Sequence, residues 1–174
     1  MEIVEEMLMK RKWAKDCLRA NIAQDDRIIK RGSVKIALVE SNLLNQKKEP
    51  ALTEAIKEIA PEWFGDETQI ILNRNVQCKK HVDKNNGYSY VCFFGDFEGG
   101  ALCFEDAVRF TDKYVWHKIN GQIPHWNEEH TGNNYSIVLY RSGAKRKKWR
   151  RLWRASKIRG RRNSFNFKDH NIYH

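Results

Sequence analysis

The sequence predicts an α+β fold that is mainly β, with N-terminal helices flanking a barrel or jelly roll and a basic C-terminal segment. Three observations support this prediction. Apolar residues recur at three- and four-residue steps near the N-terminus, short β-rich runs fill residues 68–141, and positive charge concentrates after residue 140. The 174 residues fit one structural domain. We divide it into a helical support region (1–66), a β core (67–141) and a C-terminal extension (142–174).

The first expected element is an amphipathic helix over residues 1–20. Its apolar residues lie among charged ones at helical spacing and would pack on a sheet; they are Ile3, Val4, Met7, Leu8 and Trp13. Residues 32–40 follow, and their apolar pattern fits a strand or a short helix, so both remain open.

A second helix is expected over residues 53–60. Thr53 is a candidate N-cap, Glu54 lies in the first turn, and Pro61 ends the helix. The β-rich runs begin after it, at residues 69–72, 88–94, 101–104, 113–119 and 135–140. Gly and Asn residues separate them, as tight turns require.

The composition excludes several classes of protein. With 41% hydrophobic and 11% aromatic residues, the chain can bury enough apolar surface to fold. We expect neither a membrane span nor a secretory signal, because no run of about 18 apolar residues exists and charges interrupt residues 1–20. The four cysteines form no C-x-x-C pair, which indicates reduced thiols and an intracellular protein, cytoplasmic or nuclear.

Residues 81–83, with the sequence His-Val-Asp, form the first element of a candidate metal site. On a strand, His81 and Asp83 point to the same face and can share one ion. A bare H-x-D also occurs by chance, as a surface ion pair beside Lys79 and Lys80. Two glycine-bounded strands follow, however, and His125 then precedes the last strand, where a closing barrel would return it to the pair. Two histidines and one carboxylate leave three open positions on Fe(II), as oxygen activation requires.

Residues 73–141 resemble the double-stranded β-helix core of the 2-oxoglutarate/Fe(II) dioxygenases, and most closely the TET/JBP group, which oxidises methyl groups of nucleobases. The resemblance rests on three motifs: NRNVQCKKHVDKNN (73–86), GDFEGGALCFED (95–106) and GQIPHWNEEHTGNNYSIVLYR (121–141). It implies that His81, Asp83 and His125 ligate Fe(II), with 2-oxoglutarate and O₂ as co-substrates. It also implies that Asn86 and Tyr140 contact the target base.

Three other histidines compete for the third ligand position: His117, His130 and His170. In the family that the chain resembles, the anchor of the distal 2-oxoglutarate carboxylate lies about nine or more residues after this histidine. His125 precedes Asn134 by nine residues, whereas His130 precedes it by only four, so the spacing favours His125. We expect His117 to point to solvent or to make an ordinary hydrogen bond.

The chain departs from the R-x-S pattern with which the family grips 2-oxoglutarate. It has Asn134 and Ser136 at these positions, and an asparagine cannot form the bidentate ion pair that arginine makes with a carboxylate. Arg141 is a candidate replacement, although its odd offset from Ser136 places it on the opposite face of a regular strand. Arg109 and Arg74 are the other candidates. Without any of them, the protein uses a different co-substrate or is inactive.

The C-terminal extension carries the excess of positive charge. From Arg141 onward the chain has 13 Lys and Arg against one acid, which leaves residues 1–140 with a net charge of −2 out of the total of +10. Bases surround two tryptophans at helical spacing, a pattern that fits either a helix docked on the barrel or a nucleic-acid-binding segment. A basic amphipathic helix of this kind could also bind an anionic membrane surface or a calmodulin-like groove, or serve as a nuclear-import signal. The candidate nucleic-acid-binding residues are Lys145, Arg146, Lys147, Lys148, Trp149, Arg150, Arg151, Trp153 and Arg154.

These inferences lead to three hypotheses about function. The first is a 2-oxoglutarate/Fe(II) dioxygenase that hydroxylates the methyl group of 5-methylcytosine or thymine in DNA. The second is a prolyl or lysyl hydroxylase on the same scaffold, and the third is a non-catalytic nucleic-acid-binding relative. The sequence does not indicate an oligomeric state.

Overall fold

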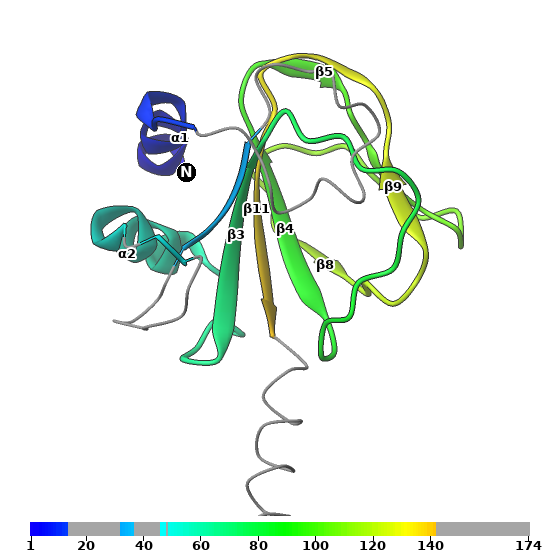
Figure 1. Ribbon diagram of the computed structural model, residues 1–174, viewed down its shortest axis with the longest axis horizontal. Helices are drawn as coiled ribbons and strands as arrows, with labels where there is room; N and C mark the ends of the chain where they lie inside the picture. The colour runs from blue at the N-terminus through cyan, green and yellow to red at the C-terminus, as the bar shows by residue number, and fades with distance from the viewer. Residues whose placement is uncertain (14–31, 37–45, 48, 142–174) are drawn as a thin grey trace, which may run out of the picture. The chain divides into compact units, whose positions relative to one another are not determined.

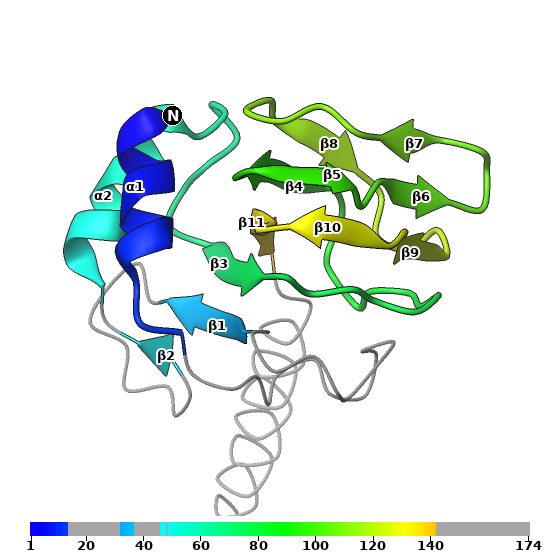
Figure 2. The ribbon, with the colours of Figure 1, turned by 90° about the horizontal axis from the view of Figure 1, so that it is seen from above.

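The computed structural model describes residues 1–13, 32–36, 46–47 and 49–141. Within this part of the chain, two helices cover one face of a six-stranded sheet, and smaller sheets lie on its other side (Figures 1 and 2). The helices are α1 (Glu2–Lys10) and α2 (Pro50–Ile59). The strands are β1 (Gly32–Ile36), β2 (Gln46–Lys47), β3 (Thr68–Arg74), β4 (Ser89–Phe94), β5 (Phe97–Gly99), β6 (Leu102–Phe104), β7 (Arg109–Phe110), β8 (His117–Ile119), β9 (His125–Asn127), β10 (His130–Gly132) and β11 (Tyr135–Arg141).

Helix α1 is shorter than its apolar pattern predicts. It ends at Lys10, because Arg11 adopts an extended conformation and donates to both carboxylate oxygens of Glu49. Trp13, expected on the apolar face of the helix, lies beyond its end and donates from Nε1 to the Leu8 carbonyl at 3.0 Å. The indole therefore satisfies one of the carbonyls that the helix terminus leaves unpaired. Residues 14–20 lie outside the described part of the chain.

Helix α2 begins three residues before its predicted start. Pro50 occupies the first turn, where its fixed φ and missing N–H are tolerated, and Glu49 is the N-cap residue. Thr53 is therefore not the cap, and its hydroxyl donates instead to the Glu49 carbonyl at 2.9 Å. The end at Ile59 agrees with the prediction, since Ala60 is extended before Pro61.

The six-stranded sheet has the order β2-β1-β3-β11-β4-β8 and is antiparallel except for the β1–β2 pair. The segment left open as strand or helix is a strand over residues 32–36, and residues 37–40 lie outside the described residues. Strand β11, the last of the described strands, is inserted between β3 and β4 at the centre of the sheet. Residues 1–66 thus contribute two strands to this sheet as well as the helices.

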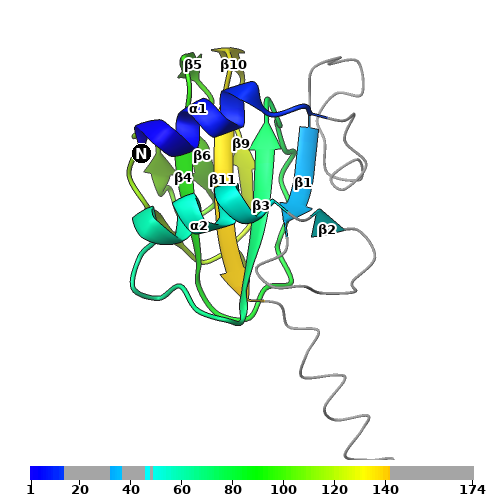
Figure 3. The ribbon, with the colours of Figure 1, turned by 90° about the vertical axis from the view of Figure 1, so that its left-hand side faces the viewer.

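Both faces of the sheet are covered, so successive side chains of its central strands point alternately into two apolar clusters. Ile137 and Leu139 of β11 pack with Val4, Leu8, Leu52 and Ile56 of the helices. Helices α1 and α2 lie against this face of the sheet (Figure 3). The opposite face carries Val91 and Phe93 of β4, which pack against Phe97, Leu102 and Phe104. This double coverage explains why β4 is buried along almost its whole length.

The second β layer consists of a three-stranded sheet, β7-β6-β9, and a two-stranded pair, β5 with β10. The strands are two or three residues long, shorter than the sequence runs predicted, and β8 occupies only the end of the expected run 113–119. Antiparallel sheets and few helices make the chain mainly β, as expected. The jelly-roll connectivity stays a prediction.

Glycines allow two loops of this layer to cross closely. Gly95 has φ of 104°, and a Cβ there would lie 2.2 Å from the Asn133 carbonyl oxygen. Gly132 has φ of 79°, and its Cβ would lie 2.2 Å from the Asp96 carbonyl oxygen. Glycine is therefore required at both positions, because each has a positive φ and neither has space for a side chain.

Among the described residues, the thiols of Cys92 and Cys103 form no disulfide bond. None of the helices in this part of the chain has the length and apolarity needed to cross a membrane.

Candidate metal centre

Residues 78–83 run antiparallel to residues 121–127, at the edge of the three-stranded sheet. His81 and His125 form a β-bridge, Asn127 donates its backbone N–H to the Cys78 carbonyl at 3.0 Å, and Asp83 donates to the Gly121 carbonyl at 2.8 Å. This pairing brings together the two stretches of sequence that contain the predicted ligands.

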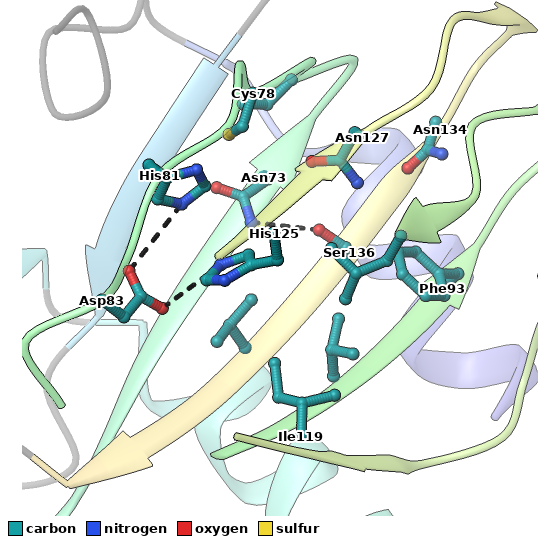
Figure 4. A pocket seen from close by; sticks show the side chains of 14 residues that line it. Asn73, Cys78, His81, Asp83, Phe93, Ile119, His125, Asn127, Asn134 and Ser136 are labelled. Carbon is teal, nitrogen blue, oxygen red and sulfur yellow. Dashed lines mark hydrogen bonds and ion pairs between the residues drawn. The ribbon is translucent and has the colours of Figure 1, made fainter. Parts of the chain in front are cut away.

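The structure brings His81, Asp83 and His125 together. One possible ligand atom from each residue lies within 4.8 Å of the other two. The Asp83 carboxylate lies between the imidazoles, with Oδ1 at 3.9 Å from His81 Nε2 and Oδ2 at 3.9 Å from His125 Nε2 (Figure 4). The histidine side chains are 10% and 5% exposed, against 22% for Asp83, so the carboxylate lies nearest to solvent.

The hydrogen bonds of the two histidines select one tautomer. His81 Nδ1 lies 2.8 Å from the Lys79 carbonyl, and His125 Nδ1 lies 2.8 Å from the Ile123 carbonyl. Because a carbonyl oxygen only accepts, each Nδ1 carries the proton in the neutral ring and each Nε2 keeps its lone pair. Metal-binding histidines typically have such a partner at the second nitrogen. Phe104 stacks on His125 with ring centroids 5.2 Å apart and restricts its orientation further.

Two neighbours position the Asp83 carboxylate. Asn85 donates from Nδ2 to Asp83 Oδ2 at 3.2 Å, and the same nitrogen lies 3.2 Å from Ser89 Oγ. Gly121 lies against the other side, where a Cβ would approach Asp83 Cβ to 2.9 Å and Oδ2 to 3.1 Å. The carboxylate is therefore held by a donor on one side and by close backbone approach on the other.

A cavity that is partly open to solvent extends from the three candidate ligands between the two β layers. Apolar side chains form much of its wall: Val76, Val91, Phe93, Leu102, Ile119 and Val138. Neutral polar groups form another part: Asn73, Asn127, Asn134 and Ser136 (Figure 4). Its shape and lining are those of a small-molecule site with a polar reacting centre.

Of the predicted 2-oxoglutarate anchors, Asn134 and Ser136 line the cavity and Arg141 does not. Arg141 Nη2 donates to the Trp63 carbonyl at 3.2 Å, and its guanidinium carbon lies 4.5 Å from the centre of the Trp63 ring. Arg141 therefore lies away from the cavity, and its role as a cofactor ligand stays a prediction. The strand is regular, so the odd offset from Ser136 sends the side chain to the opposite face.

The other two candidate arginines also lie elsewhere. Arg74 follows Asn73 on β3, and its guanidinium carbon lies 5.9 Å from the centre of the Tyr135 ring. Arg109 forms an exposed ion pair with Glu128. Neither lines the cavity.

The two residues expected to contact a base lie outside the cavity lining. Asn86 is exposed, and its backbone N–H donates to the Arg141 carbonyl at 2.8 Å. Tyr140 is buried on β11 and shares a strand face with Ser136 and Val138, which do line the cavity. Their roles in substrate binding stay predictions.

Of the three competing histidines, the two that lie in the described part of the chain do not join the cluster. His117 is buried, and its Nε2 lies 3.0 Å from the Asp112 carbonyl, which is the ordinary hydrogen bond that was expected. His130 lies on β10, with its ring edge-on to Phe97. His170 and the candidate nucleic-acid-binding residues 145–154 lie outside the described part of the chain.

Sequence reasoning missed the residues that support the ligands, namely Asn73, Asn85, Phe104 and Gly121. Asn73 Nδ2 donates to Ser136 Oγ at 3.0 Å across 63 positions of sequence, and no local pattern indicates that contact. Asn85 and Gly121 lie within quoted motifs but carry no signal of their own, because their function depends on proximity to Asp83.

Comparisons with known proteins place a 2OG-Fe(II) oxygenase family protein among the structural neighbours of this chain. No protein-family model and no curated protein matches the sequence. An oxidoreductase of the 2OG-Fe(II) oxygenase family from Burkholderia pseudomallei is similar, with a TM-score of 0.44 and 13% identity over 64% of this chain and 66% of that chain. A protein from Neisseria meningitidis is also similar, with a TM-score of 0.38 and 13% identity over 55% of this chain and 100% of that chain. The closer resemblance to the TET/JBP group stays a prediction.

Proposed function

We propose that the protein is a mononuclear iron(II) oxygenase that uses a 2-oxo acid and hydroxylates a C–H bond of its substrate. The observation that carries this proposal is the convergence of His81, Asp83 and His125 within 4.8 Å. Two neutral imidazoles with Nε2 lone pairs and one carboxylate are the donor set of non-haem Fe(II) oxygenases, so these residues fit the metal. When bound, Fe(II) supplies the activation of O₂ that oxidative hydroxylation requires.

The residues around the ligands have separate tasks in this reaction. Lys79 and Ile123 carbonyls fix the imidazoles, while Asn85 fixes the carboxylate. The apolar walls exclude water from the reacting centre and protect a reactive intermediate from side reactions. The neutral polar side chains of Asn134 and Ser136 are available to orient the co-substrate.

We further propose that the substrate is a methylated base in nucleic acid. Support comes from the net positive charge of residues 142–174 and from two lysine–aromatic pairs, the first of which adjoins the candidate ligands in the sequence. Lys80, which precedes His81, lies 5.6 Å from the centre of the Trp126 ring, and Trp126 follows His125. Lys118 lies 4.3 Å from the centre of the Tyr88 ring. Such pairs suit phosphates and stacked bases together.

The test is incubation of the full chain with Fe(II), a 2-oxo acid and O₂, with DNA that is unmodified or carries 5-methylcytosine. Nucleoside mass spectrometry should detect a hydroxylated base, and His81→Ala and Asp83→Ala should abolish it while leaving DNA affinity unchanged. Hydroxylation of an added peptide instead would favour the protein hydroxylase. DNA binding without metal binding would favour the non-catalytic relative, and Fe(II) binding without consumption of a 2-oxo acid would contradict the oxygenase.

The role of the basic segment is tested separately by replacing Lys147, Lys148, Arg150 and Arg151 with glutamine. A plot of log affinity against log salt concentration has a negative slope, and each lost phosphate contact should reduce the magnitude of this slope by about 0.9. Metal affinity should not change. An unchanged slope would contradict the assignment of DNA binding to this segment.

A further inference from the structure

The cavity that holds the candidate ligands has a simple charge balance. Among the described residues that line it, Asp83 alone carries a formal charge when the histidines are neutral. A divalent metal with the Asp83 carboxylate would therefore leave one net positive charge inside the cavity. A ligand with one negative charge neutralises this site, whereas a ligand with two leaves an excess negative charge between apolar walls.

The polar part of the lining is uncharged and prearranged. The Asn134 backbone is fixed on both sides, because its N–H donates to Asn75 Oδ1 at 2.7 Å and its carbonyl accepts from the Asn75 N–H at 2.7 Å. Ser136 Oγ accepts from Asn73 Nδ2 at 3.0 Å, so the hydroxyl hydrogen is directed to another acceptor. An uncharged acceptor on a ligand would match this group.

Three cations of the described part of the chain that do not line the cavity are engaged elsewhere. Arg109 pairs with Glu128, Arg141 contacts Trp63, and Lys113 donates to the Gly95 carbonyl at 3.1 Å. Asn134 is one of the described residues that line the cavity, so an arginine at this position could place its charge inside it. A carboxylate moved from water to such a site without a cation loses more hydration than neutral donors return.

We propose that the site takes a monoanionic 2-oxo acid with an uncharged distal end, which Asn134 and Ser136 contact, in place of the dianion 2-oxoglutarate. This inference rests on the proposed iron site. The neutral donors here do not fit the distal carboxylate of 2-oxoglutarate, and they do fit an ester, amide or hydroxyl end of similar length, each of which carries an uncharged acceptor. The metal-chelating end, a carboxylate beside a ketone, is common to both ligands.

The experiment begins with the full chain and Mn(II), whose binding is followed by electron paramagnetic resonance. The Mn(II)-loaded protein is then titrated with 2-oxoglutarate, with its 5-methyl ester and with 2-oxopentanoate. The ester removes only the distal charge, so it should bind at least tenfold more tightly than 2-oxoglutarate. The ester should also bind more tightly than 2-oxopentanoate, which lacks an acceptor for Ser136.

Two variants complete the test. Asn134→Arg should reverse the preference and favour 2-oxoglutarate over the ester, while Asn134→Gln should keep the wild-type preference. Equal or tighter binding of 2-oxoglutarate by wild-type protein that binds Mn(II) would overturn this inference and leave the iron site intact. Failure to bind Mn(II) would overturn the proposed function and this inference together. The ratio of the wild-type affinities for the 5-methyl ester and for 2-oxoglutarate decides the outcome even where Asn134→Arg does not fold.

Discussion

His81 and His125 exchange both of their backbone hydrogen bonds, with N to O distances of 2.9 Å in each direction. In a mutually bonded antiparallel pair, the two side chains leave the backbone on the same face. The ring centroids consequently lie 4.3 Å apart, and Asp83 joins them from two residues along the chain. The candidate metal centre is therefore built on backbone pairing, which makes its geometry less dependent on side-chain flexibility.

Gly121→Ala should weaken metal binding. The added Cβ would lie 2.9 Å from Asp83 Cβ and 3.1 Å from Oδ2, so the carboxylate must move away from the two histidines. We expect a loss of about 10- to 100-fold in Mn(II) affinity, as for other changes in groups that orient ligands. Gly65→Ala is the matched control, since a Cβ there meets nothing within 4 Å. Equal affinities of the two variants would contradict the placement of Asp83.

Asn85→Ala should also lower Mn(II) affinity, by about tenfold, because it removes the donor that orients Asp83 Oδ2 at 3.2 Å. Isothermal titration calorimetry measures the change. Lys84→Ala, at the exposed neighbouring position, should leave the affinity unaltered. A loss of equal size in both variants would indicate a general disturbance of the loop.

Arg11→Gln should destabilise the protein by about 2 kcal/mol, because it removes a charge-assisted pair with Glu49 that is only 8% and 23% exposed. Urea denaturation followed by tryptophan fluorescence measures the free energy of unfolding. Lys10→Gln should leave the unfolding curve unchanged, since the Lys10–Glu6 pair is 75% and 63% exposed. A similar effect of both substitutions would show that packing of the side-chain stem, rather than the ion pair, stabilises α1.

The stability of the protein should fall at alkaline pH through Cys92. Burial raises the pKa of this thiol from its ordinary value of 9.0 to about 12. The folded state keeps the proton while the unfolded state loses it, so stability is complete below about pH 9 and declines up to about pH 12. The expected slope is about 1.4 kcal/mol per pH unit for one proton.

Cys92→Ala should be less stable than the wild type at pH 8, but its stability should decline less steeply between pH 9 and 12. Urea unfolding at each pH measures both proteins, so other titrating groups cancel in the difference. Parallel slopes would contradict the assignment to Cys92. Iodoacetamide at pH 8 should also leave Cys92 unlabelled in the folded protein, as peptide mass spectrometry would detect.

Local patterns in the sequence determined the type and approximate position of most elements. Pro61 and the extended Ala60 set the end of α2, and the odd offset between Ser136 and Arg141 indicated that these two side chains lie on opposite faces of β11. Boundaries that depend on distant contacts were predicted less well. Helix α1 ends early because Arg11 pairs with Glu49, 38 residues away in the sequence.

The sequence supplied the three candidate donors, because H-x-D places two of them on one face and the resemblance to the dioxygenase family favours His125 by its spacing to Asn134. Only the tertiary structure decided that Arg141 points to Trp63 and that the donors beside Asn134 are neutral. The physical reason is the separation in sequence over which each property is determined. The direction of a side chain on a strand follows a two-residue period and is therefore local. The net charge of a cavity depends instead on residues from several segments that meet only in the folded chain.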